Sequence, residues 1–260
     1  MTSFPADPAA ALLRERAAHF AAEAALFMRD QVLSTASHDL RGPLNAMHSW
    51  AFVLERQLAH ADAGLQRALA GIRTGIEQQT RLVEAVVDAP RAATRALALH
   101  PTDVSPAEVA AHGAALARAA LADARGVRIA VTVGDGAGNA IAADGARLAQ
   151  AIFTMLVFAV EAGAPQCAVT LACANEGDAV RFDATFPARP AALTDPTLPH
   201  VFEPFARQEA QRERDGKHCA WVLALCQRVA QAHGGAFAQG PLADGAPATL
   251  SLTVPRVTAR

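Results

Sequence analysis

One stretch of the chain decides its fold: Ser34-Thr35-Ala36-Ser37-His38-Asp39-Leu40-Arg41-Gly42-Pro43-Leu44-Asn45. Around it, apolar and small residues recur at alternating spacings of four and three, the pattern of a helix that packs along a seam with another helix. The seam residues are Leu33, Ser37, Leu40, Leu44, Met47, Ala51, Leu54 and Leu58. His38 follows a seam position by one residue, so we expect its imidazole to point to solvent beside the buried stripe. Neutral imidazole is a good nucleophile near pH 7, so His38 is a candidate reactive group; the alternative is an ordinary surface histidine.

A second helix repeats the seam pattern after a short turn. Its seam residues are Leu65, Leu69, Ile72, Ile76, Gln79, Val83 and Val86, of which only Gln79 is polar. Asp62 is a suitable N-cap for this helix, and Pro43 predicts a kink in the first one, because proline removes a backbone hydrogen bond. Two such helices form an antiparallel hairpin that leaves apolar side chains exposed. We therefore expect two copies of the chain to pair into a four-helix bundle.

The run from Ser37 to Asn45 resembles the H box of sensor histidine kinases, whose helical hairpin carries a phosphate-accepting histidine. The resemblance implies that His38 accepts phosphoryl and that Asp39 orients the imidazole or acts as acid or base. It also implies a receiver-binding surface made of Arg41, Gly42 and Asn45, with a purely structural helix role as the alternative for Asn45. Gly42 stands where relatives that hydrolyse a partner's phospho-aspartate carry Thr or Asn, so we do not expect that hydrolysis here.

The N-terminal part of the chain is also predicted to be helical. Over residues 8–31, Leu13, Phe20 and Phe27 lie a heptad apart, and this phase shifts near 28–32 before the seam begins. In the family, such offsets join an upstream signalling helix to the hairpin; the alternative is an irregular coiled-coil start. The expected organisation is a signalling-type helix over 1–28, a dimerisation and phosphoacceptor hairpin over 29–95, and a second domain over 96–256.

The second domain combines helices and strands. Ser105-Pro106-Ala107-Glu108 is a capping-box signature that opens a helix to about residue 124, and Asp144 is suited to cap the next helix. Gly134 to Asn139 lacks the Lys-Ser/Thr of a phosphate-binding loop, so we interpret it as a hairpin turn. A last helix is expected over 217–232, with strands near 127–133, 166–174, 179–186, 236–239 and 248–254. This order predicts one mostly antiparallel sheet with helices on one face, an α/β sandwich, and places the whole chain in the α+β class.

The same order of elements is similar to the ATP-binding domain of the histidine kinases. Phe202-Glu203-Pro204-Phe205 matches their F box, and the run from Gln227 to Gly235 matches the end of their second glycine box. Together with the hairpin, the resemblance covers about residues 28–255. It implies a fold that binds ATP and Mg²⁺ in the family.

The positions that would hold nucleotide depart from the family's pattern. Thr154 and Phe158 stand at the two Asn positions of the metal-binding helix, and phenylalanine cannot ligate Mg²⁺. Asp183 falls near the adenine-binding segment, but without the expected glycines and out of register with the strand alternation. The glycine-rich lid is reduced to Gly216, and Trp221 takes up space that backbone needs near phosphate. We therefore expect the fold to be kept, the nucleotide chemistry to be lost, and no ATP, magnesium or other metal to serve as cofactor.

The composition sets limits on partners and location. A net charge of −2 gives no field that would attract nucleic acid or a membrane surface. The 4 cysteines form no Cys-x-x-Cys pair, so we expect free thiols. No apolar run reaches membrane-spanning length and no signal peptide opens the chain. We therefore expect a soluble cytoplasmic protein that binds neither nucleic acid nor membrane.

The leading functional hypothesis is a two-component phosphorelay protein. His38 would exchange phosphoryl with a response-regulator receiver aspartate, with an upstream kinase or sensor chain as a further partner of the homodimer. The first alternative is an active ATP-dependent sensor histidine kinase with a divergent pocket. The second is a non-catalytic regulator that binds a receiver or a kinase.

Overall fold

The computed structural model describes residues 8–58, 62–88, 97–212 and 219–256, without the side chains of 86–88. The chain divides into two compact units. One is Arg29–Ala96; the other combines Met1–Met28 with Leu97–Arg260. Each unit is described by itself.

The first unit is a helical hairpin. Helix α1 runs from Pro8 to Gln57 and continues through Pro43, and helix α2 covers Ala63–Leu82, followed by the π-helical turn η1, Val83–Asp88. The predicted cap is confirmed, because the Asp62 carboxylate accepts hydrogen bonds from the backbone of Gly64 and Leu65 at 2.8 and 3.0 Å. The rest of the predicted turn, 59–61, lies outside the described residues. The two helices meet in a small core of Leu44, Ala51 and Ile76, flanked by Leu69 and Val83.

The predicted seam is only partly covered within one chain. Its buried members in α1 are Ser37, Leu44 and Ala51. The large apolar side chains that stay exposed in the hairpin include Leu33, Leu40, Met47, Leu54, Leu65 and Ile72. A helix of a bundle contacts two neighbours, and a single hairpin supplies only one of them. The hairpin therefore has a set of exposed apolar side chains that another helical surface could cover.

The second unit is a mixed α/β domain whose elements follow the predicted order. Its helices are α4 (Pro106–Ala117), the π-turn η2 (Arg118–Ala122), α5 (Gly145–Ala162), the short turn η3 (Pro190–Leu193), α6 (Pro204–Ala210), the short turn η4 (Trp221–Leu223) and α7 (Ala224–Ala232). Its strands are β1 (Thr102–Val104), β2 (Arg128–Val133), β3 (Ile141–Ala143), β4 (Ala168–Glu176), β5 (Ala179–Pro187), β6 (Ala236–Gln239) and β7 (Pro247–Pro255). Helix α6 was not predicted, because the prolines before it indicated a loop.

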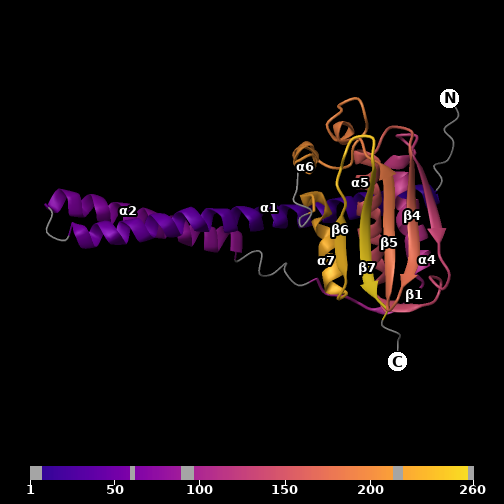
Figure 1. Ribbon diagram of the computed structural model, residues 1–260, viewed down its shortest axis with the longest axis horizontal. Helices are drawn as coiled ribbons and strands as arrows, with labels where there is room; N and C mark the ends of the chain where they lie inside the picture. Colours follow the sequence, from indigo (N-terminus) through magenta and orange to yellow (C-terminus); the bar gives the residue numbers. More distant parts are fainter. Residues whose placement is uncertain (1–7, 59–61, 89–96, 213–218, 257–260) are drawn as a thin grey trace. The chain divides into compact units, whose positions relative to one another are not determined.

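The main sheet has the strand order β2-β4-β5-β7-β6, and only the β2–β4 pair is parallel (Figure 1). Side chains of β5 and β7 alternate between buried and half-buried, so one face of the sheet packs against the helices. The predicted hairpin turn at 134–139 is wrong, because β2 pairs with β4 while β3 pairs with β1 in a separate two-stranded sheet. Alternation along a strand specifies which face is buried but not which strand lies beside it.

Helix α5 is the centre of this domain. Every residue from Leu148 to Ala162 is buried, and Asp144 caps the helix by accepting a hydrogen bond from the backbone of Arg147. Among the described helices, α5 alone is long and apolar enough to span a membrane, and 83% of that stretch is buried inside the domain. A helix that is apolar all round is typical of a protein core as well as of a membrane span. Here its length and composition are accounted for by core packing.

The start of α1 belongs to this second unit. Ala17, Ala24 and Met28 are buried in the domain core, and Leu13, Phe20 and Phe27 pack against it. In Figure 1 this first part of α1 passes behind the sheet, on the side of α5. The sequence did not predict this placement, because a heptad pattern indicates a buried stripe without identifying what covers it.

Candidate functional site

His38 lies in the middle of α1 with its side chain in solvent, as predicted. Its side chain is 90% exposed and that of Asp39 is 71% exposed. The Nδ1 atom of His38 lies 3.3 Å from Oδ1 of Asp39. A carboxylate at this atom favours the tautomer with the proton on Nδ1, which leaves the lone pair of Nε2 free. The arrangement displays an unhindered nucleophilic nitrogen on a rigid helix.

The predicted receiver-binding residues lie on the exposed surface of the same helix. Arg41, Gly42 and Asn45 are all exposed, and a Cβ atom added to Gly42 would meet nothing within 4 Å. Packing therefore does not require glycine at this position. An exposed helical glycine costs about 1 kcal/mol relative to alanine, so its presence here weakens α1 next to His38.

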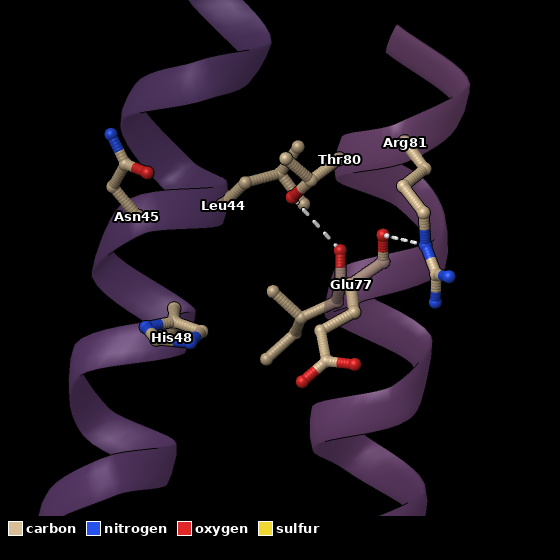
Figure 2. Close-up of a pocket in the computed structure, with 7 residues that line it drawn as sticks. Leu44, Asn45, His48, Glu77, Thr80 and Arg81 are labelled. Carbon is tan, nitrogen blue, oxygen red and sulfur yellow. Dashed lines mark hydrogen bonds between the residues drawn. The ribbon is translucent and has the colours of Figure 1, made fainter. Parts of the chain in front are cut away.

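A shallow groove lies between α1 and α2, just beyond these residues along the hairpin (Figure 2). It has a volume of about 390 Å³ and is lined by Leu44, Asn45, His48, Ile76, Glu77, Thr80 and Arg81. In Figure 2 the Glu77 carboxylate extends into the space between the two helices, whereas the Asn45 amide points away from α2. Asn45 is the only predicted site residue that lines it. Sequence analysis did not identify His48 or Glu77, because the groove exists only once the two helices are paired.

The two positions that we expect to correspond to the family's metal-binding asparagines are part of the domain core. Thr154 and Phe158 are both fully buried in α5, and the Thr154 hydroxyl donates a hydrogen bond to the backbone oxygen of Gln150 at 2.9 Å. Phe158 is among the largest fully buried side chains of the chain. Neither side chain is directed at solvent, and neither offers a free oxygen to a metal ion.

Asp183 lies on the wrong side of the sheet for a nucleotide site next to α5. Its neighbours Phe182 and Ala184 point into the core, so the side chain of Asp183 emerges from the opposite face. There its carboxylate accepts hydrogen bonds from Arg181 Nε at 2.9 Å and from Ser251 Oγ at 2.6 Å. Asp183 is therefore part of a surface polar cluster of the sheet. Its interpretation as a degenerate nucleotide-site position stays a prediction.

Of the segment expected to replace the lid, the described end at Ala220 and Trp221 is held by backbone hydrogen bonds. Gly216 lies outside the described residues. At Trp221 the backbone N–H donates to Glu209 Oε2 at 3.0 Å, and the indole ring lies against Phe205 with centroids 6.2 Å apart. Next to it, the N–H of Ala220 donates to Gln239 Oε1 at 2.7 Å. Backbone donors of this kind bind phosphate when they are free, and these two are already used.

A buried polar cluster that the sequence did not predict holds the F-box loop. The fully buried Glu161 accepts hydrogen bonds through Oε1 from the backbone of Val201 and Phe202 at 2.6 and 3.0 Å. His200 Nδ1 lies 3.2 Å from its other oxygen, and Arg125 donates to the backbone oxygen of Val160 at 2.9 Å. Burial lowers the pKa of the Arg125 guanidinium, although the Glu161 charge opposes that shift. The cluster joins residues far apart in the chain, so no local pattern could indicate it.

The described residues contain no group of three or more His, Cys, Asp or Glu side chains placed to hold a metal ion. The expectation that the protein uses no metal stays a prediction.

Comparison with known proteins identifies the family. Residues 28–94 match the family model "His Kinase A (phospho-acceptor) domain". The crystal structure of a histidine kinase from Burkholderia phymatum STM815 is 40% identical, covers 94% of this chain and 99% of its own, and superposes with a TM-score of 0.71. Full-length ShkA in complex with AMPPNP is 26% identical over 88% of this chain and 46% of its own, with a TM-score of 0.47. The catalytic domain of the histidine kinase ThkA is 13% identical over 60% of this chain and 96% of its own, with a TM-score of 0.44.

The search of curated proteins gave no match. The family model nevertheless coincides with the hairpin that carries His38, and the 40% identical structure extends across both units. The chain therefore belongs to the sensor histidine kinases of two-component signal transduction, with a HisKA hairpin followed by an ATP-binding-like domain.

Proposed function

We propose that the chain is a phosphorelay protein of histidine-kinase type whose own ATP site does not work. His38 accepts a phosphoryl group and exchanges it with the aspartate of a response-regulator receiver. The observation that carries the proposal is the contrast between an exposed His38 and the fully buried Phe158 at a metal-ligand position. A chain with this contrast retains the nucleophile and lacks the group that would hold Mg²⁺.

The transfer step needs only the nucleophile and correct positioning. Nε2 of neutral His38 attacks the phosphorus of the receiver's aspartyl phosphate, the bond from phosphorus to the aspartate oxygen breaks, and a free carboxylate leaves. The Nδ1 proton stays on the ring, where the Asp39 carboxylate at 3.3 Å stabilises the positive charge that develops. The reverse step returns phosphoryl to the receiver, so the direction of flow follows the concentrations of the two phosphorylated forms.

The proposal includes a homodimer as the working unit. Exposed Leu40, Met47, Leu54 and Ile72 support pairing of two hairpins, because apolar side chains of this size are stabilised when they leave water. The receiver would contact Arg41 and Gly42 beside His38, and Asn45 at the edge of the groove. Receivers are cytoplasmic proteins in such systems, so the proposal places this chain in the cytoplasm, supplied by an upstream kinase or sensor chain.

An active ATP-dependent histidine kinase is the second candidate. It is favoured by the retained domain fold and by the F box, which the Glu161 cluster holds in place. Under this hypothesis ATP would occupy a divergent pocket in the second unit. A regulator without phosphotransfer is the remaining possibility, and no contact among the described residues favours it over the relay.

The deciding experiment follows labelled phosphate. The purified protein is incubated with γ-labelled ATP and Mg²⁺, and separately with a receiver labelled on its aspartate. The relay predicts label from the receiver alone, the kinase predicts label from ATP, and the regulator predicts none from either source.

Matched variants identify the acceptor. His38→Ala is expected to abolish labelling, whereas His19→Ala, which removes another exposed histidine of α1, is expected to leave it unchanged. Full labelling of the His38→Ala protein would refute the site assignment. Label from ATP on His38 would refute the loss of the ATP site.

A further inference from the structure

Three buried titratable side chains meet beneath the loop that leads into the F box. Glu161 in α5 is fully buried, the side chain of His200 is 8% exposed, and Arg125, which follows η2, is 6% exposed. The imidazole lies between the other two groups. Its Nδ1 atom is 2.8 Å from Nη2 of Arg125 and 3.2 Å from Oε2 of Glu161. One ring nitrogen therefore faces a buried cation and a buried anion together.

The second ring nitrogen of His200 has a fixed role. Nε2 lies 2.9 Å from the backbone oxygen of Asp195, and a carbonyl oxygen can only accept, so Nε2 carries a proton and donates it. At Nδ1 the two neighbours make opposite demands. The guanidinium of Arg125 can only donate and needs a lone pair there, whereas an ionised carboxylate can only accept and needs a proton there. The two contacts of Nδ1 are therefore alternatives.

Each protonation state of the imidazole satisfies one of these contacts at the expense of the other. A neutral His200 accepts the hydrogen bond from Arg125 and turns its lone pair toward Oε2 of Glu161. A protonated His200 donates to Oε2 and leaves Nη2 of Arg125 without its acceptor. The shorter distance, 2.8 Å to Nη2, fits the neutral form better. Because an unpaired polar group is costly in a site of low dielectric constant, the cluster has two distinct arrangements rather than a continuous range.

The same groups attach the loop to the domain. Arg125 Nε donates to the backbone oxygen of Pro199 at 2.8 Å. Glu161 Oε1 accepts from the backbone N–H groups of Val201 and Phe202 at 2.6 and 3.0 Å. A change in the partner of the imidazole therefore acts on both attachments of the loop 199–202, which lies directly before α6.

Further charged groups surround the cluster. Asp195 lies in the turn before the loop, and hydrogen bonds from Thr197 lower the pKa of its carboxyl, with smaller contributions from the charges of Arg189 and His200. Arg207 in α6 donates to two backbone oxygens of the same region. An aspartate with a lowered pKa and the arginines keep their charge between pH 5 and 8. Among the groups named here, the pair of the imidazole and Glu161 is left to take up a proton in that range.

We propose that Arg125, His200 and Glu161 form a proton-dependent switch that sets the position of the loop 199–202. With the imidazole neutral, Nδ1 accepts from Arg125. When the pH falls, one proton from solvent binds between Nδ1 and Oε2 of Glu161, the hydrogen bond from Arg125 to Nδ1 is lost, and the loop that both groups hold changes position. Histidine is the side chain whose ordinary titration lies between pH 5 and 8, which sets the range of the switch. The switch does not depend on whether the domain binds ATP.

Nuclear magnetic resonance of the full-length, ¹⁵N-labelled protein tests the switch between about pH 5 and 8. The ring nitrogens of His200 and the backbone amides of Val201 and Phe202 are expected to titrate with one shared midpoint, because a coupled cluster takes up its proton as a unit.

Matched variants connect that titration with the cluster. His200→Gln, which cannot titrate, is expected to abolish the titration of the two amides. Glu161→Gln keeps an acceptor for them but removes the charge, and is expected to lower their midpoint by about 1 pH unit or more. His19→Gln removes a 68% exposed histidine of the same unit and is expected to change nothing.

The wild type alone is sufficient to overturn the proposal. Amides of Val201 and Phe202 that stay constant while the His200 ring titrates would do so, and so would a ring that keeps one protonation state over the whole range. In the variants, an unchanged amide titration in a folded His200→Gln protein would have the same consequence. The amides of β5 and β7 show whether a variant is folded. If His200→Gln is unfolded, the wild-type midpoints still decide, because the ring and the two amides either share one or do not.

Discussion

At the scale of the residue, Phe158 occupies a position expected to belong to a nucleotide site, and its side chain is part of the protein core. In α5 it is completely buried, where relatives are expected to present a metal-binding amide. The side chain therefore contributes packing free energy to the domain, and the space it fills is not available to a magnesium ion with its phosphates.

Replacement of Phe158 is expected to affect stability and not phosphotransfer. Phe158→Ala should lower the free energy of unfolding of the domain by about 3–5 kcal/mol, because it leaves a cavity in a close-packed core. Urea unfolding followed by Trp221 fluorescence measures this in a Trp50→Phe background, since these are the 2 tryptophans of the chain. Val133→Ala, at an exposed strand position, is the control and should cost less than about 1 kcal/mol. A loss of receiver-dependent labelling of His38 in Phe158→Ala would contradict the proposal that the transfer step needs only His38 and its positioning.

At the scale of the element, the start of α5 depends on Asp144. Its carboxylate accepts hydrogen bonds from the backbone of Arg147 at 3.0 Å and of His100 at 2.9 Å, while its own N–H donates to Nε2 of His233 at 3.1 Å. Burial alone would raise the pKa of the Asp144 carboxyl, but these two donors, together with the charges of Arg147 and His233, hold the pKa below its ordinary value. Asp144 thus connects the start of α5 with His100, which precedes β1, and with His233, which follows α7.

The lowered pKa predicts a pH dependence with a definite sign. Because the unfolded carboxyl titrates near 3.9 and the folded one lower, the stabilisation by Asp144 is fully present above about pH 4 and is lost as the pH falls through the folded value. Asp144→Asn, which keeps the cap but removes the charge that strengthens its hydrogen bonds, should cost about 1 kcal/mol at pH 7. Urea unfolding of the wild type and the variant should therefore differ at pH 7 and converge as the pH falls below about 3.9. If the difference in the free energy of unfolding between the wild type and Asp144→Asn stayed constant or grew under acid conditions, the ionised Asp144 carboxylate would not be the form that stabilises the fold.

At the scale of the whole molecule, the hairpin has more apolar surface than one chain can cover. Leu44, Ala51 and Ile76 are buried between α1 and α2, whereas Leu54 and Ile72 remain exposed. The exposed residues belong to the same four-three pattern as the buried ones, which supports the proposed bundle of more than two helices.

A charge within this surface is expected to separate the two copies. Ile72→Asp would bury an unpaired carboxylate between hairpins and should weaken the dimer by at least about tenfold, since burying one large apolar side chain is worth about 1.5–3 kcal/mol. Sedimentation equilibrium measures the dissociation constant. Gln78→Asp, a charge at an exposed polar position of α2, is the control. A wild-type protein that sediments as a monomer at micromolar concentration would contradict the proposed homodimer.

Local patterns accounted for the elements and for the exposed imidazole. The spacing of Leu44, Ala51 and Ile76 predicted two paired helices, and the side chains of Asp62, Ser105 and Asp144 predicted where helices begin. The position of His38 one residue after Ser37 predicted its exposure, because successive residues of a helix point in directions about 100° apart. Each of these features depends on neighbours within a few turns of the chain.

Partners distant in the sequence were decided only by the tertiary structure. The partner of β2 is β4 and not β3, Asp183 lies on the sheet face opposite the core, and residues 8–28 pack on α5 although a heptad pattern would equally suit a coiled coil. Periodicity states which side of an element is apolar, and any apolar surface of matching shape can cover it. The choice among such surfaces depends on packing and hydrogen bonds between residues far apart in the chain, such as Glu23 with Gln150, and these exist only in the folded molecule.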